Sequence, residues 1–242
     1  MKKPSLDPIP EGPCLLALET ATPIGSVAVF SGESLLGSVE IRREKSHARL
    51  LTPMIRDLLA YLEIAPARLD AIAVAQGPGS YTGLRVGVST AKGLCMALDK
   101  PLLSMGSLEA LGWQVQELAA QLDAWICPMI DARRMEVYCE VFDSQLVSQQ
   151  AVKARIIDAQ AFDDLLQVRK VIFLGDGAAK CRPAIGHFPN ALFLTEALST
   201  AASMGKGLAR KYEMQAFEDL ISFEPFYLKD FVATQPKNPL KA

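Results

Sequence analysis

Two short apolar runs each end in a carboxylic acid, which is the residue type that holds a metal ion beside a phosphate group. Glu19 follows the run at residues 14–18, and Asp131 follows the run at residues 126–130. In a strand–turn–strand hairpin, such an acid can bind the metal of a nucleotide while glycine, serine and threonine let the backbone approach the phosphates. The chemistry to test first is therefore nucleotide binding.

Neither turn keeps the glycines that a phosphate-binding hairpin needs. In the first turn Ala21 stands where a glycine is wanted, and Pro23 removes a backbone donor. The second turn, residues 131–136, has no glycine. Asp131 is instead expected to fix its hairpin by hydrogen bonding. We interpret both as degenerate nucleotide loops, formed by Glu19, Thr20 and Thr22 and by Asp131, Arg133 and Arg134. A competent ATPase is the alternative.

Other catalytic patterns are missing from the sequence. The two histidines, His47 and His187, lie far apart and form no HxxxH or HExxH motif for a metal. Residues 77–80 are not a nucleophile elbow, which needs G-x-S-x-G. The five cysteines form no CxxC pair and are expected to be reduced, mostly buried thiols. We therefore predict no catalytic residue and no metal site.

A glycine-rich segment at residues 76–85 carries the most information. It is expected to join a buried strand at residues 70–75 to a helix at residues 82–98. Free N–H groups at such a helix start favour an anion or a partner. The alternative is a tight turn in which glycines supply unusual dihedral angles. The residues of this glycine-rich turn that we predict to belong to a site are Gly77, Gly79, Ser80, Tyr81, Thr82 and Arg85.

Two predicted helices, at about residues 47–63 and 82–98, carry residues suited to a protein interface. The first has an apolar stripe that is wide for a helix packed on a sheet. The second has small residues at four-residue spacing, which lets another helix approach closely. The alternative is that both helices cover their own sheet. The predicted partner-binding residues are Leu51, Met54, Ile55, Leu58, Leu62, Gly83, Gly87, Ala91, Leu94, Cys95 and Leu98.

The order of predicted elements positions these residues in two similar halves. Strands at 14–18, 26–30, 35–41, 70–75 and 101–104 alternate with the two helices as βββαβα, the ribonuclease-H-like arrangement. Aligning Phe30 with Phe142 places Glu19 on Asp131, so the second half repeats the first. The predicted fold class is α/β, with two tandem ribonuclease-H-like lobes as in actin, Hsp70 and sugar kinases.

The predicted organisation has two lobes between short tails. Residues 1–13 form a proline-rich tail, 14–106 the first lobe, 107–232 a linking helix (107–122) with the second lobe, and 233–242 a frayed end. A further helix is expected at about 199–217.

Composition limits the classes of function. The 242 residues are 50% hydrophobic and 21% charged, with a net charge of −2. That charge argues against a free-standing nucleic-acid binder, which usually has a basic face. The sequence has no run of about 18 apolar residues and no signal peptide, so a cytoplasmic protein without a membrane span is expected.

Several segments together resemble the TsaB (YeaZ) family. They are residues 16–22, 47–59, the run Gly-Pro-Gly-Ser-Tyr-Thr-Gly-Leu-Arg within 76–87, residues 131–134 with 136–138, and 224–228. The resemblance covers nearly the whole chain after residue 13, and the glycine-rich run is highly specific. It implies a supporting subunit for synthesis of threonylcarbamoyladenosine in tRNA, at the adenosine 3′ of the anticodon in tRNAs that read codons beginning with A.

The resemblance also implies partners. They are the catalytic paralogue TsaD, which carries the HxxxH metal site, and the ATPase TsaE. Homodimers are expected in their absence, tRNA is reached through the complex, and no cofactor is expected except ATP or ADP at the interface of the assembled complex. If the predicted interface is right, Gly87→Arg or Leu58→Glu abolishes pairing and leaves the fold largely intact. The other hypotheses are an enzyme, either a weak ATPase or a glycoprotease-like hydrolase, and direct tRNA binding through Arg42, Arg43 and Lys45.

Overall fold

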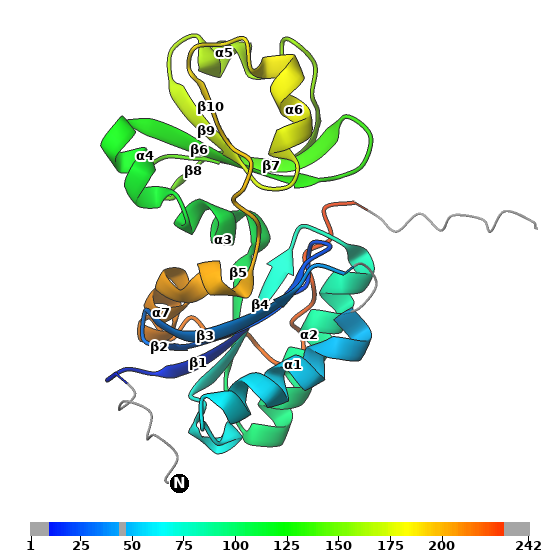
Figure 1. Cartoon of the computed structure of the whole chain (residues 1–242), viewed down its shortest axis with the longest axis vertical. Coiled ribbons are helices and arrows are strands. Elements are labelled where there is room, and N and C mark those ends of the chain that lie inside the picture. Colours follow the sequence, from blue (N-terminus) through cyan, green and yellow to red (C-terminus); the bar gives the residue numbers. More distant parts are fainter. Residues whose placement is uncertain (1–9, 44–46, 230–242) are drawn as a thin grey trace, which may run out of the picture.

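The computed structural model describes residues 10–43 and 47–229, which form two lobes, each built on one five-stranded sheet (Figure 1). The first sheet has the order β3-β2-β1-β4-β5, with β1–β2 and β2–β3 antiparallel and β1, β4 and β5 parallel. Its strands are β1 (Cys14–Glu19), β2 (Gly25–Ser31), β3 (Ser34–Ile41), β4 (Ala71–Gly77) and β5 (Leu102–Gly106).

The second sheet repeats this topology in the order β10-β9-β6-β7-β8. Its strands are β6 (Ala124–Asp131), β7 (Glu136–Phe142), β8 (Ser148–Ile156), β9 (Lys170–Leu174) and β10 (Ala191–Leu194). Glu19 ends β1 and Asp131 ends β6, so the predicted internal alignment is confirmed. The predicted α/β fold class of two tandem ribonuclease-H-like lobes is confirmed as well.

Helices cover both faces of the first sheet. The helices α1 (His47–Tyr61) and α2 (Tyr81–Leu98) lie on one face, and between them the chain makes a short 3₁₀ turn, η1 (Pro66–Arg68). Figure 1 shows these two helices side by side across the sheet. The 3₁₀ helix η2 (Ala201–Met204) and helix α7 (Gly205–Glu213) cover the opposite face.

The second lobe is covered in the same way. The helices α3 (Ser107–Trp113) and α4 (Gln116–Leu122) lie on one face of its sheet, with α5 (Asp163–Leu166) and α6 (Ala178–Ile185) on the other. Helix α3 also joins the lobes, because Leu108 and Leu111 pack in the second lobe while Ala110 packs in the first. None of the helices in the described ranges is long and apolar enough to cross a membrane.

The two helices predicted after residue 106 differ from the structure in their extent and in their lobe. The linking helix predicted at 107–122 is two helices, because Gln114 and Val115 bond back only three residues, to Leu111 and Gly112. The helix predicted at 199–217 is η2 followed by α7, which ends at Glu213. Its apolar residues pack under the first sheet, so the structure places this segment with the first lobe, whereas the sequence boundary at 107 put it with the second. Most of both predicted tails lies outside the described residues.

Candidate functional site

The carboxylate of Glu19 is buried at the end of β1, and each of its oxygens already has a partner. Oε1 accepts a hydrogen bond from the backbone N–H of Ala21 at 2.6 Å, and Oε2 accepts one from the hydroxyl of Ser199 at 2.7 Å. Burial raises the pKa of Glu19, an effect that these hydrogen bonds oppose and that the nearby Asp176 of the second lobe reinforces. The first of the two acids that the sequence offered as a metal ligand is thus bonded internally.

The rest of the first hairpin is closed onto the glycine-rich turn. The hydroxyl of Thr20 donates to the carbonyl of Gly83 at 2.8 Å, and the N–H of Ser80 donates to the carbonyl of Ala21 at 2.6 Å. Nε2 of His47 lies 3.0 Å from the carbonyl of Thr22. These contacts fill the space next to the hairpin with atoms of the chain itself.

Asp131 fixes the second hairpin, as predicted. Its Oδ1 accepts hydrogen bonds from the N–H of Arg133 at 2.6 Å and from the ammonium group of Lys180 at 2.5 Å. Lys180 also donates to the carbonyls of Arg134 and Glu136, at 2.8 and 2.7 Å. Both arginines are exposed and have positive φ angles, 70° and 50°, so this turn displays them to solvent.

The glycine-rich turn is held by a distant part of the chain. Ser80 caps α2 by accepting a hydrogen bond from the N–H of Gly83 at 3.3 Å. Gly77 has a φ of 115°, and a Cβ there would lie 2.6 Å from the carbonyl oxygen of Phe226. The N–H of Phe226 in turn donates to the carbonyl of Gln76 at 2.7 Å. The turn therefore needs glycine for its dihedral angle and for a close backbone approach.

Aromatic and basic side chains complete this contact. The rings of Tyr81 and Tyr227 lie 4.6 Å apart, Arg85 donates to the Tyr227 hydroxyl at 3.2 Å, and its guanidinium lies over the Tyr81 ring. The ammonium group of Lys92 donates to the carbonyls of residues 221 and 223. The segments 76–87 and 224–228, which are far apart in the sequence, form one structural unit.

The residues predicted to bind a partner form the core of the first lobe instead. Eight of them are buried: Leu51, Met54, Ile55, Leu58, Gly83, Gly87, Ala91 and Cys95. Leu62, Leu94 and Leu98 are half-buried against the same cluster. The alternative interpretation, that the two helices cover their own sheet, is therefore the right one for these side chains. The stripe of α1 is wide because that helix packs on the sheet and on α2 together.

The small residues of α2 make room for the first hairpin, not for another chain. A Cβ at Gly83 would lie 2.0 Å from the carbonyl oxygen of Thr20, and one at Gly87 would lie 2.3 Å from the Thr20 hydroxyl. The prediction that Gly87→Arg and Leu58→Glu leave the fold largely intact is therefore wrong, because both positions are buried and both changes would disrupt the fold before they affected a partner.

The outward face of the helix pair consists of other residues. On α2 it carries Ser89, Gly93, Met96 and Ala97, which are exposed, and on α1 it includes Tyr61. Met96 and Tyr61 are 75% and 76% exposed, and a Cβ at Gly93 would meet no atom within 4 Å. We call Ser89, Gly93, Met96, Ala97 and Tyr61 the outward face. The outward position of these α2 residues could have been predicted from the sequence, because they lie on the side of the helix opposite Leu84, Val88, Ala91 and Cys95.

The remaining sequence candidates do not come together. Within residues 10–43 and 47–229, no three histidine, cysteine, aspartate or glutamate side chains are placed to hold a metal ion. The five cysteines are buried and unpaired. In the basic cluster Arg42 pairs with Glu40, Arg43 has a partner too, and Lys45 lies outside the described residues.

Two tandem ribonuclease-H-like lobes give the chain the fold class of actin, Hsp70 and sugar kinases. The family model described as "TsaD: tRNA N6-adenosine threonylcarbamoyltransferase" matches residues 39–238. The chain belongs to the TsaB (YeaZ) family.

Three known proteins show this relationship. The chain is 32% identical over 164 residues to the tRNA threonylcarbamoyladenosine biosynthesis protein TsaB of Bacillus subtilis, covering 66% of this chain and 70% of that one. It is 36% identical over 125 residues to TsaB of Haemophilus influenzae, about half of each chain (51%). The solved structure of YeaZ from Pseudomonas aeruginosa matches with a TM-score of 0.74 and 25% identity, covering 89% of this chain and all of that one.

Proposed function

We propose that this chain takes part in the synthesis of threonylcarbamoyladenosine in tRNA as a non-catalytic subunit. The observation that carries the proposal is the internal bonding of Glu19, whose two carboxylate oxygens bind Ala21 and Ser199. Each oxygen of this carboxylate already accepts a hydrogen bond from the chain, and the side chain is fully buried, so the group is not presented to a metal or a nucleotide in solution. Asp131, its counterpart in the second lobe, is held by Lys180. The names of the curated relatives supply the pathway.

The chemistry then belongs to a partner. We propose that the chain pairs with a tRNA N6-adenosine threonylcarbamoyltransferase of the TsaD type, the family whose model matches most of this chain. In this proposal the pair modifies the adenosine 3′ of the anticodon in tRNAs that read codons beginning with A, in the cytoplasm, with the ATPase TsaE in the complex. The chain reaches tRNA only through the complex, and ATP or ADP binds only at an interface of the assembly.

The outward face of α1 and α2 is the surface that we assign to this pairing. Between Ser89 and Ala97 its exposed residues on α2 are small except for Met96, so a partner helix can approach the backbone closely there, and Arg85 adds a charged group toward the start of the helix. Met96 and Tyr61 are large exposed side chains on these two helices, and methionine and tyrosine are enriched at protein interfaces. We propose that the same face forms a homodimer when the partner is absent.

Gly93→Arg tests the assignment. Because the position is open, the variant is expected to fold normally and to weaken pairing at least tenfold by placing a long charged side chain in the contact. Size-exclusion chromatography with the transferase measures pairing, and Val147→Arg, at a position 57% exposed in the second lobe, is the matched control. Undiminished pairing of Gly93→Arg would exclude this face.

A reconstituted modification assay tests the function itself. Transferase, ATPase and unmodified tRNA are incubated with this chain, without it, or with the Gly93→Arg variant. We expect modified adenosine to form only with the unaltered chain. Equal yields without the chain would refute the supporting role. If Glu19→Gln lowers the yield while pairing stays intact, the acid takes part in catalysis and the subunit is not merely supporting.

A further inference from the structure

The second sheet ends in a short strand with an unpaired edge. β10 (Ala191–Leu194) pairs with β9 in parallel, and no other strand in the described part of the chain pairs with it. An unpaired edge presents backbone N–H and C=O groups that can bind another extended segment. In many proteins such an edge is covered or charged, whereas this one is lined with leucine and phenylalanine.

The first lobe shows how this architecture covers the equivalent edge. There β5 occupies the place that β10 has in the second sheet. Glu218, which follows α7, forms an antiparallel bridge to Leu102 of β5, and its N–H donates to the Leu102 carbonyl at 2.9 Å. The hydroxyl of Ser104 donates to the Glu218 carboxylate. The chain thus supplies a segment to one of its two equivalent edges.

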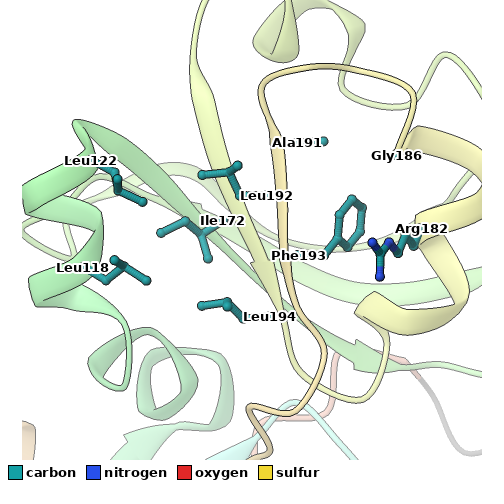
Figure 2. Close-up of a pocket in the computed structure, with 9 residues that line it drawn as sticks. All are labelled: Leu118, Leu122, Ile172, Arg182, Gly186, Ala191, Leu192, Phe193 and Leu194. Carbon is teal, nitrogen blue, oxygen red and sulfur yellow. The ribbon is translucent and has the colours of Figure 1, made fainter.

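A hollow of about 380 Å³ surrounds β10 and extends onto both faces of the strand. Figure 2 shows Leu118 and Leu122 of α4 directed toward Leu192 and Leu194 of β10 on one side. Leu118 and Leu194 are 38% and 36% exposed, so the apolar wall is open to solvent. A segment added beside β10 would bury alternate side chains against this wall.

The other side of the hollow is different in character. Arg182 of α6 lies beside Phe193 of β10 in Figure 2, with its guanidinium 5.9 Å from the ring centre. Arg182 takes part in none of the ion pairs among the described residues. Because side chains of a strand alternate between faces, a segment that buries apolar groups against α4 would direct the intervening ones toward this cation. A carboxylate there would be favoured.

The ends of this chain do not suit the β10 edge. Lys229 pairs with Glu136 at the start of β7, which β6 and β9 separate from β10. Crossing to a position beside β10 covers ~19 Å, which uses about six residues. The remaining residues include Pro236 and Pro239, and the N-terminal end includes Pro4, Pro8 and Pro10. Proline is tolerated on an edge strand only where its N–H position faces solvent, and Pro236 and Pro239 are three residues apart, so one of them would face β10. We therefore expect the occupant to come from another chain.

From this geometry we infer that β10 binds an extended segment of a partner polypeptide by strand addition. The segment carries apolar side chains at alternate positions, directed toward α4, and a carboxylate directed toward Arg182. The surface is remote from the outward face of α1 and α2, on the other lobe (Figure 1). The inference therefore does not depend on the proposed pairing, and each can fail without the other.

A phage-displayed library of random linear peptides, selected on the full chain, tests the inference. We expect enriched peptides to alternate apolar residues with at least one acid. Bound synthetic peptide of the enriched sequence is expected to slow amide hydrogen exchange at residues 191–194. Leu118→Glu and Leu194→Glu should each lower its affinity at least tenfold, and Arg182→Glu about tenfold, while Val168→Glu, at an exposed position outside the hollow, leaves it unchanged.

Each other outcome would overturn the inference. Peptides that bind Leu118→Glu and Leu194→Glu as well as the unaltered chain, or that protect a different segment, would place the site elsewhere. Protection of residues 191–194 that rises with protein concentration alone would identify a second copy as the occupant. Faster exchange there after removal of residues 230–242 would identify the chain's own end. Because exchange is measured on the unaltered chain, a variant that fails to fold does not decide the result.

Discussion

At the scale of single residues, the acids at the ends of β1 and β6 bond to groups of their own chain and hold local structure in place. Glu19 bonds two groups of its own chain, one of them 180 residues away in sequence. Asp131 forms an ion pair with Lys180 that also organises the turn after β6. Their type and position were predictable from the sequence. Their partners were not, because Ser199 and Lys180 are distant in sequence and belong to no recognisable motif.

Glu19 makes stability depend on pH in a defined direction. Burial raises its pKa above the ordinary value of 4.5, so the folded chain holds the proton more tightly than the unfolded chain does. The contribution to stability is complete below the ordinary pKa. As pH rises from there to the raised folded pKa, it is lost at up to about 1.4 kcal/mol per pH unit.

Glu19→Gln isolates this effect. The amide can still accept from Ala21 and donate to Ser199, and it has no proton to lose. Urea unfolding over a series of pH values is expected to show that the unaltered chain loses stability relative to the variant between the two pKa values. A difference between the two chains that does not change with pH would contradict a raised pKa of Glu19.

At the scale of elements, one face of helix α2 has no room for side chains at its glycines, whereas the other face is open to solvent. Gly83 and Gly87 lie against Thr20 of the first hairpin, whereas Gly93 faces open space. Glycine costs a helix interior roughly 0.5–1 kcal/mol relative to alanine. At Gly83 the chain needs glycine, because a side chain there would overlap the backbone of Thr20. At Gly93 no contact within this chain requires glycine.

Alanine at these two positions therefore has effects of opposite sign. Gly93→Ala is expected to stabilise the chain by about 0.5–1 kcal/mol, because it only improves helix propensity. Gly83→Ala is expected to destabilise it by about 1–3 kcal/mol or more, because its Cβ would lie 2.0 Å from the Thr20 carbonyl oxygen. Thermal or urea unfolding of both variants measures the difference. Equal effects would mean that the hairpin does not pack on α2 as described.

The same helix shows what sequence patterns can and cannot predict. Periodicity identified α1 and α2 and the residues that share a face, but it does not say whether that face meets a sheet or a partner. The first-lobe strands were predicted because apolar runs ended in turn residues. β8 and β10 and helices α5 and α6 were not, since β8 is largely exposed and β10 has only four residues. The β10 edge became visible only with its tertiary neighbours.

At the scale of the whole molecule, the lobes are not consecutive pieces of the chain. The chain leaves the first lobe through α3, builds the second sheet, and returns after β10 to place η2 and α7 under the first sheet. Met204 and Leu208 there pack against Leu15, Phe30 and other residues of β1 and β2. The segment 217–229 then covers the β5 edge and the glycine-rich turn. A boundary drawn in sequence could not show this, because the contacts join residues far apart.

Cutting the chain tests this arrangement. A fragment of residues 1–122 contains all five strands of the first sheet but lacks η2, α7 and the segment that covers β5. One face of its sheet is left exposed to water, where Leu15, Phe30 and Leu103 are fully buried in the whole chain. We expect this fragment to lack a cooperative unfolding transition and to have poorly dispersed amide resonances, because the apolar burial that offsets chain entropy is incomplete.

Adding residues 198–229 as a separate peptide is expected to restore dispersion, and a scrambled peptide of the same composition is the control. A fragment that unfolds cooperatively on its own would show instead that the first lobe is independent of the returning segment.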